Sequence, residues 1–184
     1  FFLPTFIAAV LLFVIGKGGS VQKLWLAGGP LYASGSLVAP IVLRLHPSDG
    51  GVAILWLFLC VWISDIGAFF VGRSLGGPKL WPRVSPKKTW SGFIGGLVFG
   101  SAAAISAVAL CRNYLGDVWL GGWQLVVVSV LAVLAAVGGD LFESAVKRHF
   151  GVKDSGSILP GHGGVMDRLD SFIAASILTF VVVW

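Results

Sequence analysis

Charged side chains are scarce in this chain of 184 residues: 11% are Asp, Glu, Lys or Arg, whereas 57% are hydrophobic. Soluble domains carry roughly a quarter charged residues, so this chain lacks the charge needed to cover a water-facing surface. Its apolar residues also fall in long runs, which is typical of membrane proteins. The composition excludes an ordinary soluble domain and predicts an all-α, polytopic integral membrane protein.

Cysteine and familiar nucleotide motifs are also scarce. Cys60 and Cys111 lie alone within or at the end of apolar runs, a context typical of buried, inert thiols and not of a disulfide or metal site. No Walker A loop or kinase signature occurs, so a soluble NTPase template does not fit. No internal repeat, low-complexity tract or signal peptide appears. We therefore interpret residues 1–184 as a single membrane domain.

The chain does contain six apolar runs, which predict about six transmembrane helices. The three long central runs suffice to cross roughly 30 Å of hydrocarbon, and the first and last are short. The second run is weaker because it contains Gly28-Gly29-Pro30. The runs are Phe1–Gly16, Leu24–Leu45, Gly51–Gly72, Ser91–Cys111, Trp123–Phe142 and Ser171–Trp184. Because the chain begins on Phe and stops inside an apolar run, we expect a fragment of a longer protein.

The basic residues predict which helix ends face the cytoplasm. Eleven of the 13 Lys and Arg residues fall in the first, third and fifth connections between the runs. Positive charge stays on the cytoplasmic side of a membrane, so these connections are expected to be cytoplasmic. Six of the acids lie on the same side. The sequence therefore predicts a site that faces the cytoplasm, at the inner membrane if the protein is bacterial.

The densest charge lies in residues 147–170. If the fifth helix continues into this stretch, Asp140, Glu143, Ser144 and Lys147 share one helical face. Carboxylates near the membrane core repel each other unless a cation lies between them, and Mg²⁺ prefers carboxylate and water oxygens. The alternative is a cytoplasmic helix end with ordinary Glu–Lys pairing.

A Gly-rich loop and a pair of acids follow. Residues 155–164 lead into a helix start, where successive backbone N–H groups can bind an anion. His162 lies between glycines, and we expect it to be accessible. The alternatives are a generic turn and, for Asp167 and Asp170, simple capping of the last helix. Four neighbouring cations favour the anion site: Lys147, Arg148, Lys153 and Arg168.

The third connection adds more cations. Lys87 and Lys88, in residues 85–92, are interpreted as phosphate ligands, whereas Arg73 and Lys79 are interpreted as ordinary cytoplasmic charge. Phosphoryl or nucleotidyl transfer requires acidic side chains to bind a hard cation, basic side chains to bind phosphates, and Gly-rich backbone that can approach the substrate closely. The sequence contains all three.

One acid lies within a predicted span. Asp65 belongs to residues 64–73, and an acid in such a position is a functional-site hypothesis by default. Its alternative is a buried pair with a Lys or Arg. We include residues 64–73 and 85–92 as segments that contribute to a catalytic signature over residues 140–170.

Residues 144–170 resemble the signature of the membrane phosphatidate cytidylyltransferases, also called CDP-diacylglycerol synthases. The matching residues are Ser144, Lys147-Arg148, Lys153-Asp154, Pro160, His162-Gly163-Gly164, Asp167-Arg168 and Asp170. Residues 64–73 and 85–89 are also similar to the family, so the resemblance covers the chain from Ser64 onward. Ile66 replaces a hydroxyl residue and Ser91 replaces a Glu, so that carboxylate has no counterpart here.

The resemblance implies that CTP and phosphatidic acid give CDP-diacylglycerol and pyrophosphate. It implies an all-helical homodimer in the lipid bilayer with Mg²⁺ and a second, monovalent cation such as K⁺, and no nucleic acid. Asp140 and Asp167 are the implied metal ligands, and Lys147 and Asp170 complete the catalytic set. The residues predicted to bind or orient substrate are Asp65, Lys87, Lys88, Ser144, Arg148, Lys153, His162, Gly163, Gly164 and Arg168.

Two alternatives remain. One is a related enzyme, either a CTP-dependent polyprenol kinase or a cytidylyltransferase for another lipid phosphate. The signature specifies nucleotide and metal chemistry better than it specifies the acyl chains of the lipid. The other is an ion-coupled transporter with Asp65 and Asp140 in its path. Transporters often show inverted repeats and broken helices at the midplane, which this sequence lacks.

Overall fold

The computed structural model describes residues 2–46, 50–115, 121–158 and 163–183. This part of the chain forms six helices and one short antiparallel hairpin between the third and fourth helices. The elements are α1 (Phe2–Ile15), α2 (Ser20–Arg44), α3 (Gly50–Leu75), β1 (Lys79–Trp81), β2 (Ser85–Thr89), α4 (Trp90–Leu115), α5 (Gly122–His149) and α6 (Met166–Val183). The predicted all-α fold class is confirmed, and the hairpin is a small addition that the apolar runs do not predict.

Helix length and composition separate the membrane-spanning candidates from the rest. Within the described residues, four helices are long and apolar enough to cross a membrane: α2, α3, α4 up to Arg112, and α5. α2 continues through Pro30 and Pro40, so the weakest predicted run is one helix. α1 has 14 residues and extends only about 21 Å, less than the hydrocarbon thickness. The chain is therefore polytopic, as predicted.

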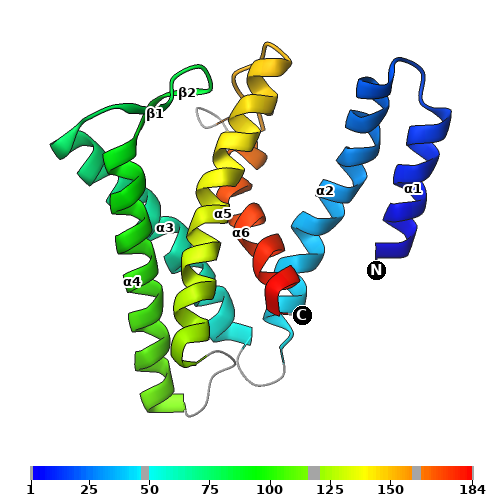
Figure 1. Ribbon diagram of the computed structural model, residues 1–184. Helices are drawn as coiled ribbons and strands as arrows, with labels where there is room; N and C mark the ends of the chain where they lie inside the picture. The colour runs from blue at the N-terminus through cyan, green and yellow to red at the C-terminus, as the bar shows by residue number, and fades with distance from the viewer. Residues whose placement is uncertain (1, 47–49, 116–120, 159–162, 184) are drawn as a thin grey trace.

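The helices are arranged with the charged connections at one end. Figure 1 shows α3, α4, α5 and α6 packed together, with the α1–α2 pair to one side of them. The α1–α2 connection, the β1–β2 hairpin and the C-terminal end of α5 lie at the same end of the bundle. The three basic connections of the sequence therefore lie at one end of the helix bundle.

The core lies where α3, α4 and α5 meet. Leu57 and Cys60 of α3 are fully buried there. The indole N–H of Trp56 donates a hydrogen bond of 2.9 Å to Ser129 Oγ, so the one polar atom of this buried ring is satisfied across the α3–α5 contact. Cys60 is a free thiol, and Cys111 is free and half-buried.

Glycines bring α3 and α4 into close contact. Gly92, Gly96 and Gly100 recur every four residues on one face of α4. A Cβ atom at Gly96 would lie 2.8 Å from the carbonyl oxygen of Ser64, and one at Gly100 would lie 2.8 Å from that of Cys60. Small residues allow such approach between helices in membranes, where packing replaces the hydrophobic effect. This contact orients the end of α3 that carries Asp65.

We expect Gly100→Leu to lower the free energy of unfolding by about 1–3 kcal/mol, because its side chain overpacks the α3–α4 contact. Thermal unfolding of the detergent-solubilised protein measures this loss. Gly138→Leu is the matched control, because a Cβ atom at Gly138 meets nothing within 4 Å. Equal stability of the two variants would contradict the role given to this contact.

Candidate active site

The end of α5 presents the predicted charged face. α5 continues to His149, and its last turns carry Asp140, Glu143, Ser144 and Lys147 along one side. Ser144 Oγ donates to Asp140 Oδ1 at 3.3 Å. Lys147 Nζ lies 3.6 Å from Glu143 Oε1, so the simple i,i+4 pairing considered as an alternative does occur. It accounts for one acid of this face and leaves Asp140 to other partners.

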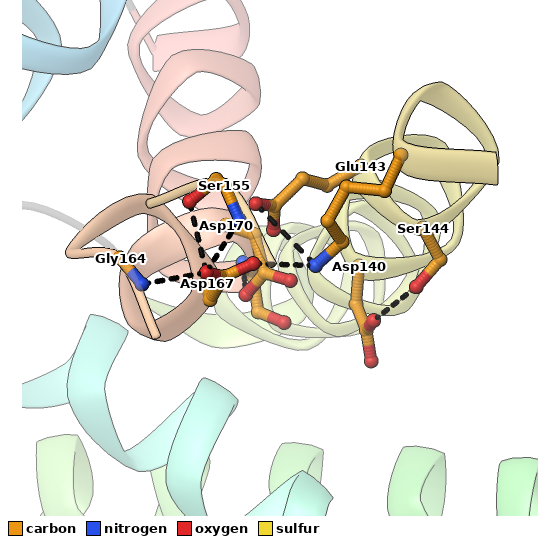
Figure 2. A network of polar contacts seen from close by, with 9 residues as sticks. Asp140, Glu143, Ser144, Ser155, Gly164, Asp167 and Asp170 are labelled. Carbon is orange, nitrogen blue, oxygen red and sulfur yellow. Dashed lines mark hydrogen bonds and ion pairs between the residues drawn. The ribbon is translucent and has the colours of Figure 1, made fainter. Parts of the chain in front are cut away.

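Asp167, in the first turn of α6, gathers four donors. Lys147 Nζ donates to its Oδ1 at 2.6 Å. Its Oδ2 accepts from the Gly164 N–H at 2.8 Å, the Ser155 N–H at 2.8 Å and Ser155 Oγ at 2.9 Å. Figure 2 shows these bonds converging on Asp167 from the loop and from α5. Asp167 therefore fastens the preceding loop and joins α6 to α5.

The same donors determine the charge of Asp167. Burial raises the pKa of its carboxyl group, but the bonds from Lys147, Gly164 and Ser155 lower it by more. The net result is a pKa well below the ordinary value, because each donor favours the ionised form. Asp167 is therefore a carboxylate at neutral pH.

The loop needs glycine where it meets Asp167. Gly163 has a φ of 79°, in the left-handed region, and a Cβ atom there would lie 2.9 Å from Asp167 Oδ2. A side chain at this position would be strained and would also press on the carboxylate. The loop backbone thus lies close against Asp167, whereas its predicted approach to a bound anion stays a prediction. His162 lies outside the described residues.

Glu143 and Asp170 form a second, deeper pair of acids. Both side chains are buried, and Figure 2 shows Glu143 of α5 facing α6 where Asp167 and Asp170 lie. Within the part of the chain that the structure describes, neither oxygen of Glu143 has a hydrogen-bond donor. Asp170 Oδ1 accepts from the Ser171 N–H at 2.7 Å. A buried carboxylate without a donor is costly, and a cation is one way to stabilise it.

Asp140 is bound from the other side by the hairpin. Lys88 Nζ, on β2, lies 2.7 Å from Asp140 Oδ2. This ion pair is partly exposed, with side chains 27% and 33% accessible, and it brings the third connection of the chain onto α5. The prediction that Lys88 belongs to the charged site is supported by this contact.

Two cavities meet at this charged region. The larger, of about 660 Å³, lies between α3, α4 and the hairpin and is lined by four cations: Arg73, Lys79, Lys87 and Lys88. The smaller, of about 480 Å³, is lined by Asp140, Asp167 and Asp170 together with Lys147 and Arg168. Asp65 lines both. We call them the basic cavity and the acidic cavity.

The acids of the acidic cavity suit a hard cation by their chemistry, because Mg²⁺ prefers carboxylate oxygens. Glu143 does not line this cavity, and the nearby cation at its Oε1 is Lys147, at 3.6 Å. Across the described ranges, however, no three His, Cys, Asp or Glu side chains are gathered closely enough to hold a metal. Asp140 and Asp167 are instead each paired with a lysine, which supplies the positive charge in this arrangement.

Comparison with known proteins now identifies the family. The profile of the cytidylyltransferase family matches residues 1–184. This chain belongs to the cytidylyltransferase family. The phosphatidate cytidylyltransferase of Brucella suis biovar 1 is 46% identical over 173 residues, which cover 94% of this chain and 61% of that relative. That of Staphylococcus aureus strain COL is 51% identical over 126 residues, or 68% of this chain and 46% of that relative. The chain thus spans less than two thirds of these relatives.

In this cytidylyltransferase-family chain, most of the predicted site residues lie together. The residues that line a cavity or bond to one that does are Asp65, Lys87, Lys88, Asp140, Ser144, Lys147, Gly164, Asp167, Arg168 and Asp170. Arg148 and Lys153 are exposed and line neither cavity. Their predicted substrate contacts remain predictions.

Three further residues lie in this charged region although the sequence did not assign them to the site. Arg73 and Lys79 were interpreted as ordinary cytoplasmic charge, yet both line the basic cavity. Glu143 was predicted on the charged face, where a cation and pairing with Lys were the two interpretations, but it was not included among the site residues; it is buried beside Lys147. A signal for Arg73 was its place at the end of the family-like segment 64–73. The signal for Glu143 was its helical spacing from Asp140 and Lys147, whereas Lys79 carried no comparable signal.

We expect Asp167→Ala to lower the free energy of unfolding by roughly 1–3 kcal/mol, because it removes the acceptor of several hydrogen bonds between loop, α5 and α6. Denaturant unfolding in detergent measures this, and hydrogen exchange should rise at the amides of Ser155 and Gly164. Asp154→Ala is the control, since Asp154 is an exposed acid in the same connection. If the two variants were equally stable, the fastening role of Asp167 would be wrong.

Proposed function

We propose that the full-length protein is a phosphatidate cytidylyltransferase, which transfers CMP from CTP to phosphatidic acid and releases pyrophosphate. The observation that carries this proposal is the meeting of a basic and an acidic cavity at Asp65 in a cytidylyltransferase-family chain. The names of the relatives add support. A reaction between two anions needs cations to overcome their repulsion, and it needs a second set of groups to stabilise the charge on the transferring phosphorus.

The two cavities suit different substrates. The four cations of the basic cavity suit the triphosphate of CTP, since lysine and arginine bind phosphate by charge-assisted hydrogen bonds. Lys147 and Arg168 of the acidic cavity suit the phosphate of phosphatidic acid. Asp65, at the boundary, is suited to orient one of the two substrates.

The reaction itself needs little from the protein beyond position and charge. An oxygen of the phosphatidate phosphate attacks the α-phosphorus of CTP, the bond from that phosphorus to the bridging oxygen of the β-phosphate breaks, and pyrophosphate leaves with the electron pair. The attacking oxygen is already ionised near neutral pH, so we assign no general base. Lys88 and Lys147 hold the phosphates in line, and proximity supplies much of the rate.

Mg²⁺ is the proposed metal, with Asp140 and Asp167 as its ligands. When bound, it supplies positive charge that stabilises the transferring phosphoryl group. A second, monovalent cation such as K⁺ and assembly as a homodimer are proposed on the same family resemblance. So is the cytoplasmic orientation of the site, which the concentration of basic connections at one end of the bundle supports. A single membrane domain, with its signature over residues 140–170, also stays a prediction.

The first test uses full-length protein in detergent with phosphatidic acid and CTP. We expect Mg²⁺-dependent pyrophosphate release, lowered about a hundredfold or more in Asp167→Asn because a preorganised charge at the reacting centre is lost. Rates are compared below the unfolding midpoint of the variant. Release of CDP in place of pyrophosphate, with a polyprenol acceptor, would favour the kinase alternative. Absence of turnover with every lipid acceptor would contradict the proposal.

A second prediction concerns the hairpin. We expect Lys88→Met to lower kcat/KM for CTP by about tenfold or more, because a charge-assisted phosphate contact is lost and Asp140 is left without its partner. Steady-state kinetics with varied CTP measures this. Arg83→Met is the matched control, because Arg83 belongs to the same connection, is exposed and lines neither cavity. Equal effects of the two substitutions would mean that only the overall charge of the hairpin matters.

A further inference from the structure

A third cavity, of about 380 Å³, lies between α2, α5 and the residues that lead into α6. We call it the lateral groove. Its lining is almost entirely apolar and includes Trp25 and Tyr32 of α2, Phe142 of α5, and Phe150 and Met166 beyond it. Neither the fold nor the reaction proposed above explains why an apolar hollow should adjoin the charged end of α5.

Two aromatic pairs connect α2 with α5 and its end, and residues of both pairs line the lateral groove. Trp25 meets Phe150 edge-on at 5.5 Å between ring centroids, and Tyr32 meets Phe142 at 6.5 Å. Between these pairs, on the same face of α2, lie Gly28-Gly29, which line the groove without side chains. The aromatic pairs therefore act as spacers, and the glycines leave the gap between them open.

The lateral groove opens toward the surface that a bilayer would cover. Phe142 and Phe150 on its walls are 55% and 57% exposed, although both are large apolar side chains. Exposed apolar side chains on a membrane-spanning helix face lipid. In a polytopic membrane protein, a hollow of this kind beside membrane-spanning helices is accessible to lipid.

Among the described residues, two charged ones line the lateral groove, Glu143 and Lys147, and they form an ion pair of 3.6 Å, so Lys147 is the one cation of this lining. Lys147 lines both the lateral groove and the acidic cavity, and its ammonium group bonds to Asp167. Ser155, whose hydroxyl group donates a hydrogen bond to Asp167, also lines the groove. An apolar channel that ends at a lysine is complementary to an amphiphile with an anionic head. A packed helix from a second copy of the chain would have no need of that cation.

We infer that the lateral groove holds an acyl chain of the lipid substrate, whose phosphate lies at Lys147. The identity of that lipid as phosphatidic acid rests on the proposed function above. The groove then determines the direction from which the lipid approaches: sideways from the bilayer between α2 and α5, with its head passing Lys147 into the acidic cavity. Gly28 and Gly29 are the specificity-determining residues, since their lack of side chains leaves room for the chain.

Substitution of these glycines tests the inference directly. A Cβ atom at Gly28 or Gly29 would meet nothing within 4 Å, so a leucine there fills the groove without pressing on the backbone. In the full-length protein, we expect Gly28→Leu and Gly29→Leu to raise KM for dioleoyl phosphatidate by about tenfold or more. KM for CTP and turnover of dihexanoyl phosphatidate should stay unchanged.

Gly51→Leu is the matched control, because Gly51 is an exposed helical glycine with equally open surroundings, outside the groove. Long-chain selective loss in the two groove variants alone supports the inference. Equal losses with long and short chains, or no loss with either, overturn it.

A labelling experiment on the wild-type protein separates this inference from the proposed function. Phosphatidate that carries a diazirine in one acyl chain is photolysed with the full-length protein without CTP, and the labelled peptides are mapped by mass spectrometry. We expect labels in residues 25–32 and 142–152, suppressed by unlabelled phosphatidate and not by phosphatidylcholine. Labels elsewhere, or equal suppression by both lipids, overturn the inference.

This readout needs no turnover. Specific labelling of the groove without pyrophosphate release would support the groove and contradict the proposed reaction. Pyrophosphate release with labels confined to other helices would support the proposed reaction and contradict the inference about the groove. The labelling also stands if the leucine variants fail to fold.

Discussion

The ion pair between Lys147 and Asp167 joins the end of α5 to the start of α6, and the other polar contacts of this region are arranged around it. Charge within an apolar bundle is costly unless it is paired or hydrated. Asp167 meets this constraint by using both oxygens, one for the lysine and the other for loop donors. The chain after α5 must therefore fold back on α6, and the loop lies where its backbone N–H groups reach the carboxylate.

A second ion pair, between Lys88 and Asp140, applies the same constraint on the opposite side of α5. Two lysines from different segments thus neutralise the two acids that are the proposed metal ligands. Under the proposed function, phosphate groups compete for these lysines, and the freed carboxylates gain affinity for a hard cation. Substrate and metal would then favour each other's binding, because each takes one partner of an existing pair. The partly exposed Lys88–Asp140 pair is the easier of the two to exchange.

Much of this arrangement can be predicted from the sequence. The helices follow from apolar runs, because a chain that crosses hydrocarbon must satisfy its backbone hydrogen bonds internally. The face formed by Asp140, Glu143, Ser144 and Lys147 follows from helical periodicity alone. The start of α6 at Met166, five residues before the apolar run at Ser171, follows less easily, since run length shows where hydrocarbon begins and not where a helix does. Those extra residues form the turn that carries Asp167, whose side chain bonds to the preceding loop and to α5.

What the sequence could not distinguish is charge that sets topology from charge that builds a site. Arg73, Lys79, Arg148 and Lys153 all lie in basic connections, and the positive-inside rule accounts for each of them equally well. The fold separates them through a strand pairing that the sequence pattern does not reveal. Lys79, on the hairpin, lines the same cavity as Arg73, whereas Arg148 and Lys153 lie exposed at and beyond the end of α5. A short two-stranded pairing of eight residues in all thus decides which cations face a cavity. The lateral groove also follows from a feature that, in the sequence, is only a weakness. Gly28 and Gly29 make the second apolar run less hydrophobic because they have no side chains, and the same lack of side chains leaves room for the groove.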